Sequence, residues 1–365
     1  MSRAARAHEP APPPHPARAP QDALEVSPLA SAIVVSRDLP DPLRVTLASL
    51  RAQRGVELEI LLVLARARDA RLEAAWAADL AAVTVIVAGH DAGFAAGVNL
   101  GLRAARGRYV LLLNDDAWAH PDWAGALIAE AERDPRVGMC AGKVLLAGSP
   151  GRLDTTGHLL AADGLNRGRG RLEIDRAQYD TRRDVLFPSG AAALYRRELL
   201  LGCGGLEERF FAYGEDTELG IRARLAGYRC RYVPDALAWH VGSVTAGAYS
   251  PFKAYHVERN RVWLVAKHFP LGLVALNPAL TAVRHLVQAW GVVRGRGASA
   301  RFQERARGAG LIGAALRSLA DGWIGVPRML AARWRLRRER RISPRAIYGW
   351  IRRDGLTLHD IAWTD

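Results

Sequence analysis

An apolar run in this chain ends in three residues that could do chemistry, Asn114, Asp115 and Asp116. The four residues before them, Val110–Leu113, are all apolar, which is typical of a buried strand. Hard divalent cations such as Mg²⁺ and Mn²⁺ take one or two carboxylates together with phosphate oxygens of a substrate. The three residues therefore suit a cation that faces a phosphate. The alternative, a solvated turn followed by a helix cap, stays open on this stretch alone.

A second candidate is the acidic pair Glu215-Asp216, which follows the aromatic stretch Phe210–Tyr213 and Gly214. A carboxylate near aromatic side chains that exclude water can act as a general base toward an alcohol. The simpler alternative is that Asp216 caps a helix. His240 ends an extended run, and a lone histidine is more often structural than a ligand. Beside a carboxylate site, however, it can complete the coordination of a divalent cation.

The elements that must position these residues follow from the pattern of the first half, where short apolar runs alternate with helical patterns. This alternation predicts parallel strands joined by crossover helices in a doubly wound α/β sheet. Ligands of such sheets bind beyond the carboxyl ends of the strands, where Asn114, Asp115 and Asp116 lie. The predicted strands are residues 31–36, 58–64, 82–88 and 108–114, and the predicted helices are residues 42–53, 72–80 and 93–107.

Several local details follow from residue type. Asp41 is expected to cap the first helix with Pro42 at its first position, and the glycines of the 93–107 helix are expected on its surface. Residues 145–190 are rich in Gly, Arg and Asp, which predicts loops and short strands over the sheet edge. The remaining expected elements are a helix from Asp216 to Gly227, an extended segment over 229–240 and helices from Pro251 onward.

Composition narrows the class of protein. The formal charge of +14 and pI near 10.4 predict attraction to an anionic partner, but charge alone does not choose among nucleic acid, phosphorylated molecules and acidic lipid. The three cysteines, Cys140, Cys203 and Cys230, have neither zinc-site nor disulfide spacing, which favours a reducing, cytosolic compartment. No charge-free apolar run is long enough to span a membrane. Residues 1–27 are rich in Ala and Pro and are expected to be a disordered tail.

Three blocks of the sequence together resemble the family 2 inverting glycosyltransferases of the GT-A fold, nearest to bacterial rhamnosyltransferase-like members. The blocks are GFAAGVNLGLRAARGRYVLLLNDDAWAHPDW, FPSGAAALYRRELLLGCGGLEERFFAYGEDTELGIRARLAGYRCRYVPDALAWH and KAYHVERNRVWLVAKHFP. The resemblance implies a Rossmann-like GT-A fold with a mostly parallel central sheet. It implies a catalytic domain over residues 28–250, followed by a helical, basic amphipathic region over 251–365.

The resemblance also implies roles for the candidate residues. The aspartates after the fourth strand of the family bind a divalent metal, Mn²⁺ or Mg²⁺, that holds the diphosphate of a nucleoside-diphosphate sugar. Asp116 takes the metal-ligand position with Asp115 beside it, and Asn114 stands in place of the first carboxylate. The catalytic base maps to Asp216, with Glu215 as the alternative, and a late histidine that binds metal in some members maps to His240.

Two departures from the family pattern affect the expected nucleotide site. The first strand ends in Ser36-Arg37-Asp38, and Leu64 stands where similar proteins carry an aspartate that contacts the nucleotide base. Leucine cannot accept a hydrogen bond from a base N–H, so base recognition is expected from the backbone or from other carboxylates. The candidate contacts to the nucleotide sugar are Ser36, Asp38, Asp69, Asp91, Asn114, Asp115, Gly190, Arg259 and Arg261. For the two arginines, a solvated basic helix face is an equally good interpretation.

The C-terminal third alternates apolar and Trp positions with arginines, from Gly310 to Arg341. A basic amphipathic helix with Trp is typical of a membrane interface, and the alternative is a helical cap packed on the catalytic domain. The resulting hypothesis is a glycosyltransferase at the cytoplasmic face of the cell membrane. It moves a sugar, with rhamnose among the candidates, to a hydroxyl of a cell-surface polysaccharide or lipid-linked glycan precursor. A non-catalytic glycosyltransferase-like partner is the main alternative, and nucleic-acid binding is disfavoured because no reader motif is present.

Overall fold

The computed structural model describes residues 29–66, 76, 78–242, 250–294, 308–357, 360 and 361. The predicted tail over residues 1–27 and most of the predicted 72–80 helix lie outside these residues.

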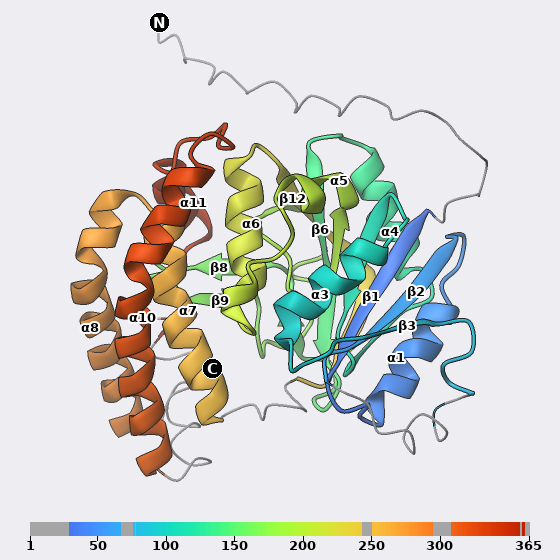
Figure 1. The fold of residues 1–365 in the computed structure, drawn as a ribbon, viewed down its shortest axis with the longest axis horizontal. Helices are drawn as coiled ribbons and strands as arrows, with labels where there is room; N and C mark the ends of the chain where they lie inside the picture. The colour runs from blue at the N-terminus through green and yellow to red at the C-terminus, as the bar shows by residue number, and fades with distance from the viewer. Residues whose placement is uncertain are drawn as a thin grey trace, which may run out of the picture.

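A ten-stranded sheet forms the body of the larger part of the molecule (Figure 1). Its strand order is β10-β12-β6-β11-β4-β1-β2-β3, with β5 paired to β12 and β7 paired to β6. Strands β3, β2, β1 and β4 are parallel, as predicted, whereas β11 runs antiparallel to both of its neighbours, β4 and β6. The strands are β1 (Ala30–Ser36), β2 (Leu58–Leu64), β3 (Thr84–Val87), β4 (Tyr109–Leu113), β5 (Ala117–Ala119), β6 (Val137–Leu146), β7 (Leu153–Thr155), β8 (His158–Leu160), β9 (Asn166–Gly168), β10 (Arg183–Val185), β11 (Ala192–Arg196) and β12 (Arg229–His240).

Both faces of the sheet are covered by helices, because alternate strand residues point to opposite sides. On β1, Ala32 and Val34 pack in one cluster with α1 and α4, while Ile33 packs in the other with α3, α5 and α6. The helices are α1 (Pro42–Arg51), α3 (Gly93–Ala104), α4 (Trp123–Glu132), α5 (Arg197–Gly202), α6 (Glu215–Leu225), α7 (Pro251–His268), α8 (Leu271–Val293), α10 (Gly308–Leu336) and α11 (Ala346–Asp354), with a short 3₁₀ turn at Glu208–Phe210.

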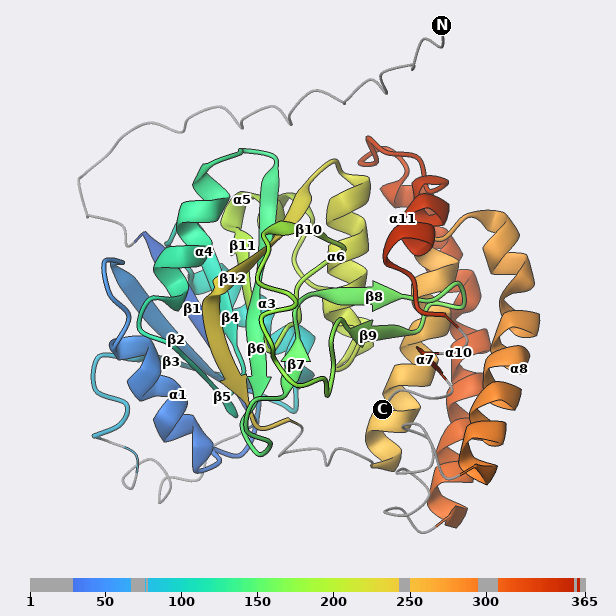
Figure 2. The same ribbon diagram turned by 180° about the vertical axis from the view of Figure 1, so that it is seen from behind.

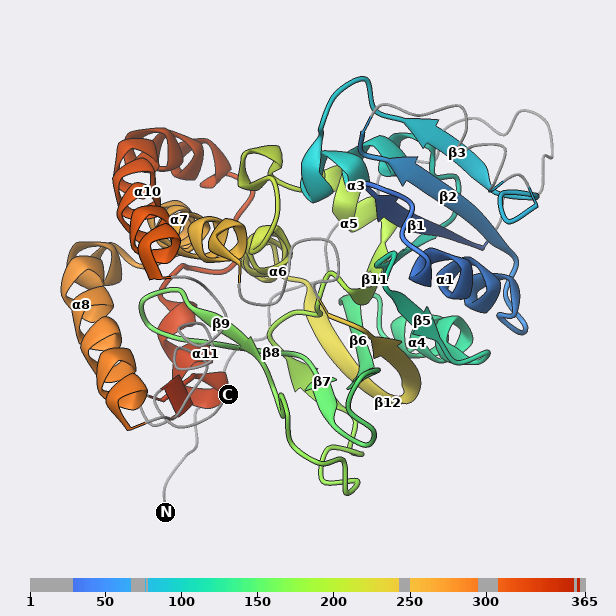
Figure 3. The ribbon, with the colours of Figure 1, turned by 90° about the horizontal axis from the view of Figure 1, so that it is seen from below.

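Helices α7, α8, α10 and α11 lie together on one side of the sheet, as Figures 2 and 3 show. Apolar residues of α6, such as Ile221 and Leu225, pack against Leu264 of α7, Leu273 of α8 and Ile347 of α11. Helix α6 therefore lies between the sheet and this helical layer, and its first turn carries the predicted acidic pair.

Gly97 and Gly101 of α3 face the sheet, so the prediction that the glycines lie on the helix surface is wrong for these two. A Cβ atom at Gly97 would lie 2.6 Å from Val35 Cγ1, and one at Gly101 would lie 2.6 Å from Ile33 Cγ2. Only glycine allows α3 to approach β1 this closely. The error arose because helix propensity disfavours glycine without saying which face it occupies.

Other local predictions are also corrected. Asp41 precedes α1, with Pro42 at its first position, but the Asp41 side chain makes no capping hydrogen bond. Helix α6 begins at Glu215 rather than at Asp216, with Gly214 at the N-cap. Strand β6 has no counterpart among the predictions, because its sequence VGMCAGKVLL mixes small residues with a lysine. Within the described residues, no helix has the length and apolarity to cross a bilayer.

Candidate active site

Asp116 and His240 meet at one edge of the sheet through backbone pairing. Asp116 lies just beyond β4, and the next residue, Ala117, is paired with His240 across the antiparallel ladder of β5 and β12. The Val241 amide also donates a hydrogen bond of 2.9 Å to the Asp116 carbonyl. As a result, His240 Nε2 lies 3.2 Å from Asp116 Oδ1.

This pair has the geometry of two neighbouring ligands on one hard cation. Adjacent positions around an octahedral ion with bonds of about 2.1 Å are roughly 3 Å apart, close to the observed separation. The described residues contain no cluster of three or more His, Cys, Asp or Glu side chains that could enclose a metal. A two-residue site is nevertheless what Mg²⁺ or Mn²⁺ uses when substrate phosphates supply the remaining oxygens. Asp116 and His240 therefore fit a metal that binds together with a diphosphate.

Asp154 orients the histidine, and no motif or periodic pattern pointed to it. This residue lies in β7, its carboxylate is buried, and its Oδ2 is 2.8 Å from His240 Nδ1. Burial alone would lower the pKa of His240, but hydrogen bonds to Asp116 and Asp154 raise it to about 9. Burial would likewise raise the pKa of Asp154, yet the His240 hydrogen bond and charge, with help from Arg171, lower it to about 2. With Nδ1 held by a carboxylate, Nε2 is the nitrogen that could bind a cation once it releases its proton.

Asp115 and Asn114 occupy different positions around this pair. The Asp115 carboxylate turns toward β1, where Ser36 Oγ donates a hydrogen bond of 2.8 Å to its Oδ2. Burial raises the pKa of Asp115 to about 6, partly offset by that hydrogen bond. Asn114 Nδ2 lies 3.4 Å from His240 Nε2. Asn114 therefore lies beside the Asp116–His240 pair, whereas the Asp115 carboxylate is hydrogen-bonded to Ser36.

The two carboxylates at the start of α6 differ in exposure: Asp216 is partly exposed and Glu215 is buried. Asp216 Oδ2 accepts a hydrogen bond of 3.0 Å from the Gly190 amide, and its Oδ1 accepts one of 2.6 Å from the Thr217 amide. The side chain of Glu215 is 5% exposed, and its Oε2 has no hydrogen-bond partner among the described residues. Burial, reinforced by the Asp216 charge, raises the pKa of Glu215 to about 8. Of the two, Asp216 is the partly exposed carboxylate that a ligand could reach.

Residues 189–191 link the two acidic centres. The Asn114 amide donates a hydrogen bond of 3.0 Å to the Ala191 carbonyl, and the neighbouring Gly190 amide holds Asp216. A Cβ atom at Gly190 would meet Asp216 and Phe94 at 3.5 Å, an ordinary contact, so close approach does not by itself require glycine here. The link follows from the position of Ala191 next to β11, which pairs with β4.

Two further ionisable side chains that sequence reasoning missed lie in the same region. Burial lowers the pKa of His158, while the charges of Asp216 and Asp154 act in the opposite direction. Burial and the Arg171 charge lower the pKa of Lys253 to about 8, against the influence of Asp154 and Asp116. The charges of both acidic centres therefore act on His158, and those of Asp154 and Asp116 act on the Lys253 ammonium group.

Comparison with known proteins identifies the family. A sequence model described as "Glycosyltransferase like family 2" matches residues 28–264. The chain belongs to this family. It is 29% identical over 214 residues to the O-antigen biosynthesis protein RfbC of Myxococcus xanthus, covering 56% of this chain and 16% of that protein. It is 34% identical over 87 residues to N-acetylglucosaminyl-diphospho-decaprenol L-rhamnosyltransferase of Mycobacterium tuberculosis, covering 24% of this chain and 28% of that protein.

Solved structures confirm the GT-A fold that the sequence predicted. GalNAc-T7, solved with UDP, GalNAc and Mn²⁺, superposes with a TM-score of 0.55 at 15% identity, covering 67% of this chain and 49% of that one. S. aureus TarS 1-349 superposes with a TM-score of 0.51 at 18% identity, covering 83% of this chain and 82% of that one. At these identities the likeness speaks to the fold alone. The chain spans less than a third of the length of the curated relatives that it matches.

The carboxyl ends of β1, β2 and β3 carry two exposed ion pairs. Arg66 pairs with Asp38 at 3.1 Å, and Arg37 pairs with Asp91 at 2.6 Å. Both predicted aspartates are thus gathered beyond the carboxyl ends of β1, β2 and β3. Leu64 is 3% exposed and packs in the core, so its side chain offers nothing to a base. Asp69, another predicted contact, lies outside the described residues.

The partners of Arg259 and Arg261 are not Asp38 or Asp91. The alternative interpretation, in which the two arginines form a solvated basic helix face, is wrong. Both are buried. The Arg259 guanidinium donates to the carbonyls of Arg209 and Phe210, and that of Arg261 lies against Asp163 and pairs with Glu258. Helical periodicity could not reveal this, because α7 is covered on one side by α6 and on the other by α10.

Proposed function

We propose that this family 2 protein is a metal-dependent inverting glycosyltransferase that moves a sugar from a nucleoside-diphosphate donor to a hydroxyl group. In this proposal Asp116 and His240 hold the cation, and Asp216 accepts the proton of the attacking hydroxyl. When bound there, Mn²⁺ or Mg²⁺ would supply Lewis-acid stabilisation of the charge on a departing diphosphate, a contribution worth several kcal/mol. A positioned base typically contributes about 10²- to 10⁴-fold to such a reaction.

The observation that carries the proposal is the contact of His240 Nε2 with Asp116 Oδ1 at 3.2 Å, next to a separate, partly exposed carboxylate on Asp216. Asp154 holds Nδ1 of the ring, so Nε2 is the nitrogen directed at Asp116. Inversion requires a base on the side of the sugar opposite the leaving group. Two acidic centres linked through residues 189–191 supply both functions from one chain.

For the donor, Asp38 and Asp91 remain proposed contacts to the nucleotide, with Arg37 and Arg66 as new candidates. Their exposed ion pairs can exchange for contacts to a base, a ribose or a phosphate at little cost, because exposed pairs contribute only ~0–1 kcal/mol. Rhamnose is the proposed sugar on the ground that one relative is named a rhamnosyltransferase. The acceptor is proposed to be a growing cell-surface polysaccharide or a lipid-linked glycan precursor.

Calorimetric titration with dTDP, UDP and GDP, with and without Mn²⁺, tests the site directly. We expect Mn²⁺-dependent binding of one of these nucleotides, and its loss in the Asp116→Ala variant, because one of the two cation ligands is then missing. Binding that does not depend on Mn²⁺ would remove the metal from the proposal. If no nucleotide binds, the protein is better explained as a non-catalytic glycosyltransferase-like partner.

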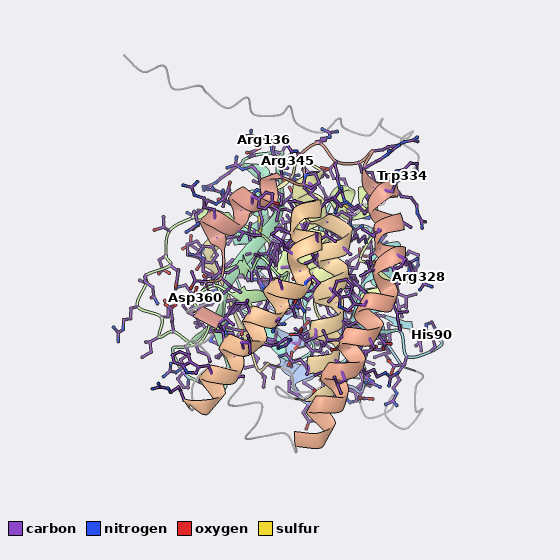
Figure 4. The ribbon with its side chains drawn as sticks, turned by 90° about the vertical axis from the view of Figure 1, so that its left-hand side faces the viewer. His90, Arg136, Arg328, Trp334, Arg345 and Asp360 are labelled. Atoms are coloured by element: carbon purple, nitrogen blue, oxygen red, sulfur yellow. The ribbon has the colours of Figure 1, made fainter. Side chains whose placement is uncertain are left out.

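We also propose that the helical layer lies on an acidic lipid surface at the cytoplasmic face of the membrane. Residues 251–365 contain 21 Lys and Arg against 7 Asp and Glu, whereas residues 1–250 contain 30 of each, so this region accounts for all of the net charge. Figure 4 shows this side of the molecule, with Arg328 and Trp334 labelled on α10. The layer exposes large apolar side chains, among them Leu286 and Trp290 on α8 and Leu316, Trp323, Ile324 and Trp334 on α10. Basic residues with exposed Trp and aliphatic side chains fit an anionic membrane interface.

Sedimentation with vesicles of phosphatidylglycerol and phosphatidylcholine tests the membrane proposal. We expect binding to acidic vesicles that weakens as salt is raised and that falls further in the double variant Leu286→Glu/Ile324→Glu. Val45→Glu, which places a carboxylate at an exposed apolar residue of α1, is the control and should bind like the parent protein. Equal sedimentation with pure phosphatidylcholine, or an unchanged double variant, contradicts the proposal.

A further inference from the structure

The backbone that leads into Asp216 is strained. Phe211 and Tyr213 have φ angles of 63° and 65°, in the left-handed region that side chains other than glycine rarely adopt, and Gly214 follows at 87°. Residues held in this region persist only where the surroundings determine the conformation, and they concentrate at functional sites. The turn at residues 210–214 therefore needs contacts from other segments to keep this conformation and to hold the start of α6 in place.

Asn260 of α7 supplies that restraint. Its side chain is 1% exposed, and Nδ2 lies 2.9 Å from the Phe210 carbonyl oxygen, 2.9 Å from that of Ala212 and 2.6 Å from that of Tyr213. One amide group therefore donates to three carbonyls of the turn, with its two protons shared among them. The Phe210 carbonyl also accepts from the Ala212 amide at 2.7 Å, so Asn260 adds a second donor there and bridges it to the carbonyls of Ala212 and Tyr213.

The neighbouring Arg259 extends the same contact. Its guanidinium donates to the carbonyls of Arg209 and Phe210 at 3.1 Å each, and it packs over the rings of Tyr255 and Trp263. The aromatic packing fixes the guanidinium in place. Together, Arg259 and Asn260 hold the chain on both sides of the first strained residue.

Helix α3 holds the opposite side of the turn. The Ala95 amide donates to the Phe211 carbonyl at 3.2 Å, and a Cβ atom at Gly93 would lie 2.6 Å from the Phe211 ring. The Gly214 carbonyl accepts from the Glu218 amide within α6. Each carbonyl from Arg209 to Gly214 thus has a donor, which explains why the turn holds its shape.

We propose that Asn260, assisted by Arg259, is a positioning residue for the general base. This inference rests on the proposed function, in which Asp216 accepts the acceptor proton. The hydrogen bonds from Gly190 and Thr217 set the orientation of the carboxylate, while the Asn260 contacts set the path of the backbone that carries it. Asn260 acts on the reaction only through Asp216 and touches neither donor nor acceptor.

The first test compares Asn260→Ala with Asn277→Ala. Asn277 is a buried asparagine of α8 whose amide also donates to a backbone carbonyl, that of Asp163 at 3.0 Å, so it is a matched control remote from the turn. The assay measures nucleoside diphosphate release from UDP-, GDP- and dTDP-sugars with Mn²⁺, together with nucleotide affinity. We expect turnover to fall about 10- to 100-fold in Asn260→Ala, because a small displacement of a reacting group has this effect, with nucleotide affinity unchanged. A parallel loss of nucleotide affinity, or unaltered turnover, overturns the inference.

A double-variant comparison tests whether the effect passes through Asp216. In an Asp216→Asn background, adding Asn260→Ala should change the residual turnover little, because residues that act as one unit are not additive. If the fold-loss of turnover in the double variant equals the product of the two single losses, Asn260 acts independently of Asp216. Arg259→Lys is the second variant if Asn260→Ala does not fold. It keeps the charge but loses the planar pair of donors, and we expect a smaller loss of turnover in the same direction.

A readout independent of activity separates this inference from the proposed function. Amide hydrogen exchange over residues 210–217 should accelerate in Asn260→Ala and not in Asn277→Ala. If the parent protein releases no nucleoside diphosphate from any donor, the proposed function fails while faster exchange still supports the restraint. Unchanged exchange overturns the restraint whatever the activity.

Discussion

The two halves of the candidate site are built in different ways. Asp116 and His240 are carried by regular strands, and the register of β5 with β12 is enough to bring them together. Asp216 follows a strained turn whose shape depends on side chains of α7, more than forty residues later in the chain. The first half is therefore set largely by backbone hydrogen bonding, and the second by tertiary contacts. A change in each half should consequently affect a different step.

The largest effect is expected in the base half. Asp216→Asn keeps the shape of the side chain and its hydrogen-bond acceptor for Gly190 but removes the basic carboxylate. Turnover should fall about 10²- to 10⁴-fold, while Mn²⁺-dependent nucleotide binding stays as in the parent protein. Steady-state turnover and calorimetry on the same preparation measure the two quantities. If nucleotide affinity falls with turnover, the two halves are not separable and the comparison fails.

A change in the half that contains Asp116 and His240 should instead lower the affinity for the metal. His240→Gln removes the imidazole that faces Asp116 and leaves Asp154 paired with Arg171 but not with His240, so Mn²⁺ affinity in the presence of nucleotide should fall about 10- to 100-fold. Calorimetry or the Mn²⁺ electron paramagnetic resonance signal measures it. His120→Gln, an exposed histidine just before α4, is the control. Unaltered Mn²⁺ affinity would remove His240 from the cation site.

The same contrast explains what the sequence could predict. Apolar runs identified β1 to β4, and polar residues at the end of β4 identified Asp116, because a strand end is a local signal. Asp154, His158 and Lys253 gave no such signal, since their roles depend on a segment of weak periodicity and on packing between α7 and the sheet. The acidic pair was singled out from its residues and Asp216 was proposed as the base by family resemblance, whereas Arg259, which contacts the turn before it, was expected at the diphosphate. Tertiary contacts between distant segments leave no periodic pattern.

The smallest expected effect sharpens the assignment within the base half and concerns Glu215. Its pKa is raised from 4.5 to about 8, so between these values the folded protein holds a proton that the unfolded chain releases. The free energy of unfolding should therefore decrease as the pH rises through this window. Glu215→Gln cannot ionise and should escape that decrease, so its melting temperature should exceed that of the parent protein by a margin that widens from pH 5 to pH 8.

Differential scanning calorimetry at several pH values measures this margin, with Glu198→Gln on the exposed start of α5 as the control. Turnover provides the second readout. Because the Glu215 carboxyl is buried beside an available Asp216, Glu215→Gln should retain most of the parent activity, in contrast to Asp216→Asn. Loss of turnover in Glu215→Gln with Asp216→Asn still active would reverse the roles of the two carboxylates. A melting curve that shifts in parallel with the parent protein at every pH would mean that Glu215 is not held neutral by burial.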